Sequence, residues 1–221
     1  MRFVLLSMIV LAGGLSGIEN GAYTYRSVTG DRTNTYIVSW KEDRNIIRLS
    51  SSNVAGTRDT DCIHALNGAM LRWESTETWT IIGVRSNTAV HFSGTLAGKP
   101  VVGRSVELGA IPWYQLFELP IALFVRSGSR EQPFWVVNPA DLTANNLMMI
   151  REGTETITVG GVSRTALRVR MTILGPFSMF WSALYWCRAD DGICIKFDRP
   201  NGMPGTPITC GELIAEKLSE L

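Results

Sequence analysis

The segment "DTDCIH", residues 59–64, places four side chains close together that could ligate a metal or exchange protons. They are Asp59, Asp61, Cys62 and His64. If the segment is a β-strand, Cys62 and His64 point to the same face. A structural zinc site needs a second pair of ligands at a similar spacing, but the sequence has no such pair, no HExxH motif and only 2 histidines. We therefore expect no metal and no cofactor.

Nucleophilic chemistry lacks its usual sequence signals. No G-x-S-x-G motif is present, and the "GVSR" around Ser163 has the composition of a hairpin turn. Cys62 or Cys187 could pair with His64 or His91, but no carboxylate evidently orients the pair. Carboxylate pairs of the glycosidase type form only in space and stay open. The sequence favours a non-enzymatic protein, with an enzyme assembled in three dimensions around "DTDCIH" as an alternative.

Cysteines could also form disulfides. The four are Cys62, Cys187, Cys194 and Cys210, which allow three pairings. In "WCRADDGIC", a type I turn over "ADDG" places Cys187 opposite Ile195 and Cys194 on the other face of the hairpin. This register disfavours a bond between Cys187 and Cys194, although a four-residue loop would shift it by one residue and allow the bond. A Cys194–Cys210 bond and four separate thiols are the other options.

Aromatic residues are the strongest positive signal for function. The chain has 7 Trp and 8 Phe, and most must lie in the core. As a set they could also line a cavity for an apolar guest. The expected lining residues are Trp73, Trp113, Leu116, Phe117, Leu123, Phe124, Trp135, Trp181 and Tyr185.

Most of the chain that must position these side chains has the pattern of β-strands. Within residues 165–174, Leu167 and Val169 alternate with Arg168 and Arg170, which predicts one buried face. Further strands are expected at 22–28, 33–41, 45–51, 69–75, 78–85, 89–96, 100–107, 133–137, 155–159, 179–188, 193–198 and 207–214. Because turn signals separate them, we expect an antiparallel meander.

Three segments depart from this pattern. Residues 113–127 are apolar on nearly every side and predict a helix bent or broken at Pro120. Residues 139–150 predict a turn with a short helix or loop, and 212–221 either continue the last strand or form a helix. Since a helix that is apolar all round must be buried, the predicted fold is mainly β. About ten antiparallel strands form a single strongly curved sheet, a half-barrel, wrapped around this buried helix.

Composition and the N-terminus indicate the compartment. The chain has 221 residues, 45% of them hydrophobic, and a net charge of +1, which gives no sign of a nucleic-acid partner. Arg2 precedes an uncharged apolar stretch that ends near Gly17 and is too short to span a membrane comfortably. We predict a signal peptide over residues 1–22, cleaved between 17 and 22, and one domain over 23–221. A retained N-terminal anchor is the alternative, and no membrane span is expected in the mature chain.

The C-terminal part resembles a known kind of protein. The segments "PFWVVNPADLTA", "ETITVGGVSRTALRVRMTI", "FWSALYWCRADDGICIKFD" and "GMPGTPITCGELI" are similar to uncharacterised secreted bacterial proteins that resemble the outer-membrane lipoprotein carrier superfamily. The resemblance covers about residues 70–215 and implies a half-barrel that holds acyl chains between its sheet and helices. This chain differs in having one convincing helix, which argues against a large lipid cavity. Its Cys187, Cys194 and Cys210 also occupy strand positions where apolar residues are expected.

Together these patterns predict a periplasmic or secreted binding or carrier protein without catalytic residues. Its ligand would be an apolar or lipid-like molecule held between sheet and helix. The alternative is a structural or interaction protein of the envelope, with a self-filled core and no ligand. Such a protein could contact an envelope partner through the loop "RPNGMPGTP".

Overall fold

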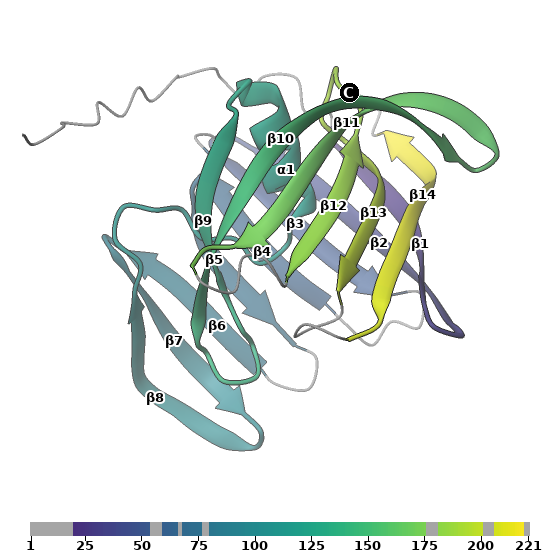
Figure 1. Ribbon diagram of the computed structural model, residues 1–221. Coiled ribbons are helices and arrows are strands. Elements are labelled where there is room, and N and C mark those ends of the chain that lie inside the picture. The colour runs from purple at the N-terminus through teal and green to yellow at the C-terminus, as the bar shows by residue number, and fades with distance from the viewer. Residues whose placement is uncertain are drawn as a thin grey trace, which may run out of the picture.

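The computed structural model describes residues 20–53, 59–65, 68–76, 80–175, 181–200 and 206–218, which form a sheet of 14 strands and an α-helix (Figure 1). The strands are β1 (Gly21–Thr29), β2 (Arg32–Asp43), β3 (Ile46–Asn53), β4 (Asp59–Ala65), β5 (Met70–Ser75), β6 (Thr80–Ser86), β7 (Ala89–Leu96), β8 (Lys99–Glu107), β9 (Glu131–Val137), β10 (Ala144–Val159), β11 (Val162–Ile173), β12 (Ser182–Cys187), β13 (Cys194–Pro200) and β14 (Ile208–Leu218). The helix α1 spans Glu118–Ser127. The predicted mainly β fold is confirmed.

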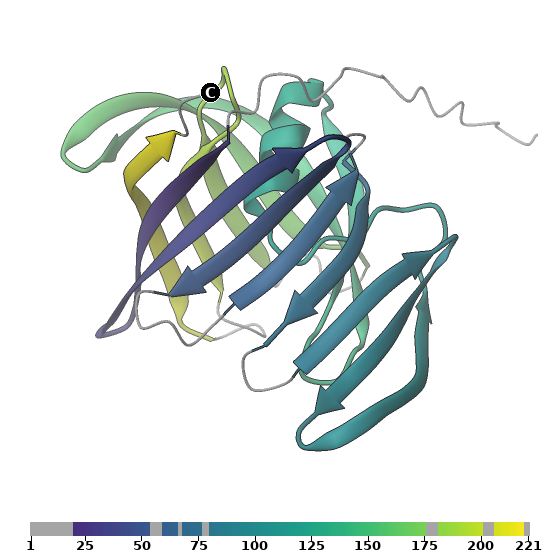
Figure 2. The same cartoon turned by 180° about the vertical axis from the view of Figure 1, so that it is seen from behind.

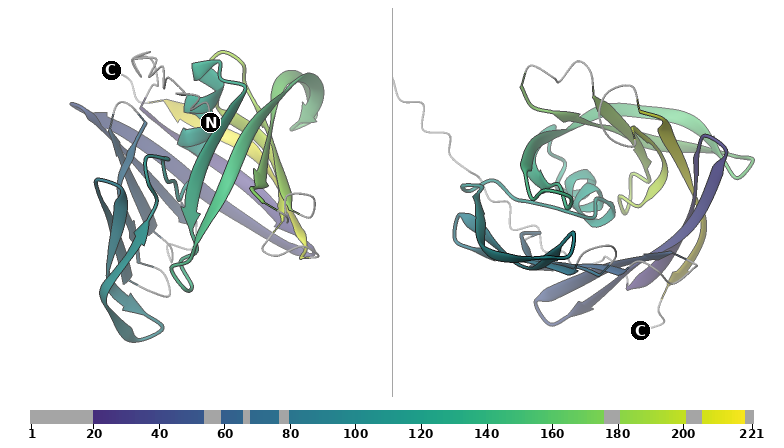
Figure 3. Two further views of the ribbon diagram at one scale, coloured as in Figure 1. Left: turned by 60° about the vertical axis from the view of Figure 1, so that its left-hand side comes forward. Right: turned by 90° about the horizontal axis from the view of Figure 1, so that it is seen from below.

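Two antiparallel meanders build the sheet, and the first and last strands join them. The strand order is β8-β7-β6-β5-β4-β3-β2-β1-β14-β13-β12-β11-β10-β9. The junction pairs Gly21 with Leu218 and Thr29 with Thr209. The purple and blue strands β1–β5 cross one side of α1 in Figure 2, and the view from below in Figure 3 shows the sheet curled around the helix. The predicted half-barrel around a helix is therefore the observed architecture.

The strand β11 shows why the sequence folds in this way. Val169 and Met171 are buried on the concave face, while Arg168 and Arg170 point outward and form ion pairs with Glu152 of β10. Alternation with a period of two therefore commits one face of the strand to the core. The sheet has 14 strands rather than about ten: β4 at 59–65 is the one strand outside the 13 expected segments, and β10 begins at Ala144 rather than at residue 155.

The helix is shorter than the sequence predicts. It begins at Glu118 rather than at residue 113, and Pro120 lies in its first turn. The first four N–H groups of a helix have no partner within it, so the missing N–H of Pro120 costs nothing there. The predicted bend or break at Pro120 is wrong for this reason. Gly128, with φ 71°, ends the helix by donating its N–H to the Val125 carbonyl.

Residues 108–117 connect β8 to α1 and are held by hydrogen bonds on both sides. Arg85 donates to the carbonyls of Gly109 and Ile111 at 2.7 and 3.0 Å. The Tyr114 N–H donates to the Trp135 carbonyl of β9 at 2.8 Å. The sequence assigned residues 113–117 to the helix because their composition is apolar, but Trp113 forms a bridge with Trp135 of β9, and the Tyr114 N–H bonds to the same strand.

The hairpin of β12 and β13 corrects the predicted cysteine arrangement. Cys187 and Cys194 lie directly opposite each other, with a register shift after Trp186. The Arg188 N–H donates to the Ile193 carbonyl, which closes a four-residue loop, and the Asp191 carboxylate stabilises it by accepting the Ile193 N–H. Both cysteines are buried thiols on the core side. The exposed Cys210 is paired with Asp198 rather than with Cys194.

The structure also decides the two remaining segments that the sequence left open, residues 139–150 and 212–221. Residues 139–141 form the turn, but the chain then enters β10 at Ala144 rather than a helix. The last strand continues through Leu218, so no terminal helix forms in the described residues. At the other end, β1 begins at Gly21, within the range in which the sequence predicts signal cleavage. The predicted signal residues 1–19 lie outside the described residues.

Candidate functional site

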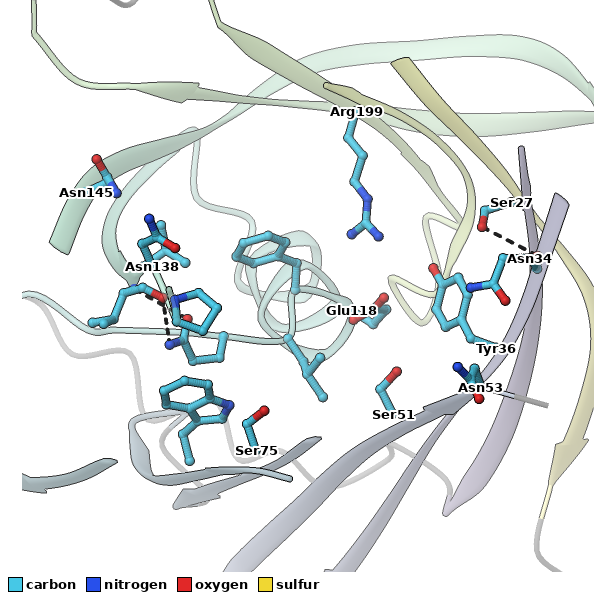
Figure 4. A pocket seen from close by; sticks show the side chains of 17 residues that line it. Ser27, Asn34, Tyr36, Ser51, Asn53, Ser75, Glu118, Asn138, Asn145 and Arg199 are labelled. Carbon is cyan, nitrogen blue, oxygen red and sulfur yellow. Dashed lines mark hydrogen bonds between the residues drawn. The ribbon is translucent and has the colours of Figure 1, made fainter. Parts of the chain in front are cut away.

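A cavity of about 540 Å³ lies between the start of α1 and the concave faces of both meanders (Figure 4). Its apolar lining consists of Trp73, Leu116, Phe117, Val136, Val137 and Pro139. Polar side chains form the rest of the wall and come from β1, β2, β3, β5, β10, β13, the turn after β9 and the residues around the helix start. The volume lies in the range of about 300–1,000 Å³ that is usual for small-molecule sites.

The polar wall on the N-terminal meander follows from strand alternation. Asn34 and Tyr36 lie two residues apart on β2, and Ser51 and Asn53 lie two residues apart on β3. Tyr36 is paired in register with Asn53, and Asn34 with Ser27 of β1. Because residues at i and i+2 share a face, these strand ends present polar groups to the concave side. Farther along the same strands that side is apolar, with Val38 and Leu49 buried.

Two charged side chains face the cavity from opposite elements. Glu118 is the first residue of α1, and Arg199 projects from β13. Figure 4 shows the Arg199 guanidinium pointing toward Glu118 and Tyr36 across the cavity. The guanidinium carbon lies 4.9 Å from the centroid of the Phe197 ring, in cation–π geometry. Burial raises the pKa of Glu118, although attraction to Arg199 opposes this shift.

Replacing Glu118 by glutamine is expected to raise the free energy of unfolding at about pH 8. Burial holds the folded-state pKa of Glu118 above its unfolded value, so the ionised carboxylate weakens the folded state as the pH rises through that pKa. Glutamine carries no charge, so its advantage should shrink as the pH falls toward about 4.3. Urea denaturation at several pH values measures this difference. A glutamine at the exposed Glu107 is the control, and an E118Q advantage that grows with acidity would contradict the assignment.

Two neutral donors on the cavity wall have no partner among the described residues. They are the Tyr36 hydroxyl and the Trp73 Nε1. An unsatisfied buried donor costs about 1–3 kcal/mol. Together with Arg199 they make the wall rich in donors, which suits a ligand that carries acceptor oxygens.

The nine side chains expected to line a cavity lie in several places. Trp73, Leu116 and Phe117 line the cavity described above. Trp113 and Phe124 are fully buried in the core, and Tyr185 is buried there beside Phe197. Leu123, Trp135 and Trp181 are half-buried outside the cavity lining. The indoles of Trp113 and Trp135 donate to the carbonyls of Met70 and Leu108.

The polar lining escaped the sequence reasoning. On an antiparallel strand, polar residues at every second position ordinarily indicate the solvent face, so Asn34 and Asn53 gave no sign of facing inward. Glu118 interrupted an apolar segment, and Arg199 lay beside a proline-rich turn. The one available signal was the change of polarity along β2 and β3, which are apolar at one end and polar at the other on the same face.

The "DTDCIH" segment forms β4, and Cys62 and His64 are both buried there. His64 lies with its Nδ1 3.4 Å from the Gly68 carbonyl and its ring 5.9 Å from Tyr114. The side chains of Asp59 and Asp61 lie outside the described residues. Across the part of the chain that the structure describes, no group of three or more His, Cys, Asp or Glu could hold a metal ion. Nor is any described helix long and apolar enough to cross a membrane.

Comparison with known proteins identifies the fold. No protein-family model matches the chain, and no curated protein matches it. Its structure is similar to the crystal structure of a β-barrel-like protein of the domain of unknown function DUF1849 from Brucella abortus, with a TM-score of 0.62 and 8% identity. The match covers 92% of this chain and 99% of that one. The resemblance to half-barrel proteins of unknown function is therefore confirmed for the fold.

Two weaker matches accompany it. The hypothetical lipoprotein YmcC from Escherichia coli matches with a TM-score of 0.42 and 12% identity, over 91% of this chain and 86% of that one. A LolA superfamily protein from Nitrosomonas europaea matches with a TM-score of 0.25 and 7% identity, over 92% of this chain and 86% of that one. At these scores neither match carries an argument about function.

Proposed function

We propose that this protein is a non-enzymatic binding or carrier protein of the periplasm or cell exterior for a small lipid-like molecule. The observation that carries the proposal is the cavity of about 540 Å³ between α1 and the sheet. Its wall combines apolar and polar side chains, which suits an amphipathic ligand better than a hydrocarbon. The apolar stretch after Arg2 supports the compartment.

The apolar part of the ligand would lie against Leu116, Phe117 and Trp73. Each methylene group removed from water contributes about 0.8 kcal/mol, so a short acyl chain provides most of the affinity without a specific polar motif. The wall is supported from behind, because Ile121 and Phe124 of α1 are fully buried against the sheet. A supported wall reduces the ordering that binding requires, which favours affinity.

The second candidate is an envelope interaction protein whose core is filled by its own helix. The complete burial of Leu119, Ile121 and Phe124 favours it, since these side chains already occupy the space under most of α1. The loop suggested for partner contact includes residues 201–205, which lie outside the described residues. A binding experiment separates the two candidates.

The purified protein is expected to bind dodecanoate and the neutral monododecanoylglycerol in titration calorimetry. Leu116→Gln should weaken both by about tenfold, because it removes apolar contact at the cavity wall without disturbing the fully buried core. Leu123→Gln is the matched control, since Leu123 is a half-buried leucine of α1 outside the cavity lining. Failure of the wild-type protein to bind either probe would overturn the proposal, as would equal losses in the two variants.

A further inference from the structure

Arg199 gives the cavity a cationic side chain. The side chain is half-buried on β13 and lines the cavity. No ion pair joins Arg199 to a carboxylate of the described residues, whereas Arg168 and Arg170 both pair with Glu152. Arginine remains protonated and presents five N–H donors in a planar fork. The guanidinium donates to the Tyr185 hydroxyl and lies over the Phe197 ring, and a fork with five donors retains further N–H groups for a ligand.

Neutral donors also line the cavity. The Tyr36 hydroxyl, on β2, has no partner among the described residues, and Figure 4 places Tyr36 and Arg199 facing the same space. The Trp73 Nε1 is likewise unsatisfied and belongs to the lining. Leaving such donors unpaired is costly, and acceptor oxygens of a ligand would satisfy them. The pattern of a guanidinium with neutral donors is typical of carboxylate and phosphate recognition.

Glu118 is the one carboxyl group in the described lining of the cavity, and its environment limits its opposition to an anion. Burial raises its pKa, which favours the neutral carboxyl over the carboxylate. A neutral carboxyl has an O–H that can donate to an anionic oxygen. Attraction to Arg199 opposes this shift, and no ion pair within 4.0 Å joins the two side chains among the described residues.

We propose that Arg199 and Tyr36 bind the anionic oxygens of the ligand's headgroup, a carboxylate or phosphate, while the ligand's apolar tail lies along Leu116 and Phe117. This inference rests on the proposed function, because it assigns the headgroup chemistry of the same cavity. The two groups of side chains come from different elements: Arg199 and Tyr36 from β13 and β2, and Leu116 and Phe117 from the residues before α1. The fork of Arg199 would accommodate either planar or tetrahedral oxyanions.

Calorimetric titration of the purified protein with matched probes tests the inference. Dodecanoate is expected to bind at least about tenfold more tightly than monododecanoylglycerol, which has the same tail and no charge. Arg199→Met, which keeps an apolar stem, should abolish this preference, while Arg199→Lys should retain part of it. Glu118→Gln should keep the preference for dodecanoate, because the neutral amide also carries an N–H donor. Inorganic phosphate without a tail shows whether the headgroup side binds a free anion.

The outcomes distinguish the inference from the proposed function. If the wild-type protein binds dodecanoate no more tightly than monododecanoylglycerol, and R199M gives the same two affinities, the headgroup assignment is overturned. The cavity would then bind amphiphiles without recognising their charge. If neither probe binds, the proposed function itself fails. If phosphate binds as tightly as dodecanoate, the tail contributes nothing, and the cavity is a site for a free anion rather than a lipid-like molecule. Circular dichroism of R199M checks that a lost preference does not reflect unfolding.

Discussion

Replacing Gly192 by alanine is expected to lower the free energy of unfolding by about 3 kcal/mol. Gly192 ends the loop between β12 and β13 with φ +77°, in the left-handed region that favours glycine. A Cβ there would lie 2.6 Å from the Ala122 carbonyl oxygen and 2.7 Å from the Ala122 Cα of α1. Since these are backbone atoms, the hairpin and the helix would have to move apart, and urea denaturation would report the loss.

Gly160 provides the matched control for this substitution. It also has a positive φ, of +57°, but a Cβ there would meet nothing within 4 Å. Gly160→Ala should therefore lower the free energy of unfolding by only about 1 kcal/mol, the cost of a residue with a Cβ in the left-handed conformation. Equal losses at the two positions would show that the contact between the hairpin and α1 contributes nothing to stability, contrary to the structure.

Acidification from about pH 6.5 to about pH 4 is expected to cost about 3 kcal/mol of stability through His64 alone. Burial lowers the pKa of His64 to about 4 in the folded protein. In this pH range the unfolded chain binds a proton at His64 and the folded chain does not, so protons favour unfolding. The loss begins below the unfolded pKa and stops growing once the pH falls below the folded pKa. Urea denaturation at intervals across the range measures it.

His64→Phe isolates this contribution, because phenylalanine keeps a ring against Tyr114 and cannot be protonated. The variant should lose less stability on acidification than the wild-type protein, by about 3 kcal/mol over the range. Glu118 acts in the opposite sense, since its raised pKa makes the folded state take up a proton as the pH falls. If the free energy of unfolding falls by the same amount on acidification in the wild-type and His64→Phe proteins, His64 takes up its proton in the folded state as it does in the unfolded chain.

Local sequence pattern was sufficient to predict most of the sheet. The alternation of residues 165–174 corresponds to β11, and its inward and outward side chains are as expected. The helix was identified from its apolar composition, but its start was not, because composition does not show that Trp113 and Tyr114 pair with β9 across the fold. The cysteine register failed for a similar reason. The four-residue loop, which the expected turn type did not include, is held by the Arg188 N–H on the Ile193 carbonyl and by the Ile193 N–H on the Asp191 carboxylate.

The residues of the candidate site likewise fall into two groups: those that the sequence identified, and those that only the tertiary structure showed. Sequence determined that the protein is a curved antiparallel sheet around an apolar helix, because side-chain alternation and turn residues act over a few neighbouring positions. It also singled out Trp73, Leu116 and Phe117 of the cavity wall. Only the tertiary structure decided that Tyr36, Glu118 and Arg199, from β2, α1 and β13, face one cavity. Their meeting depends on how the two meanders join at β1 and β14 and curl around α1, and no local pattern encodes the closure of a sheet over that distance.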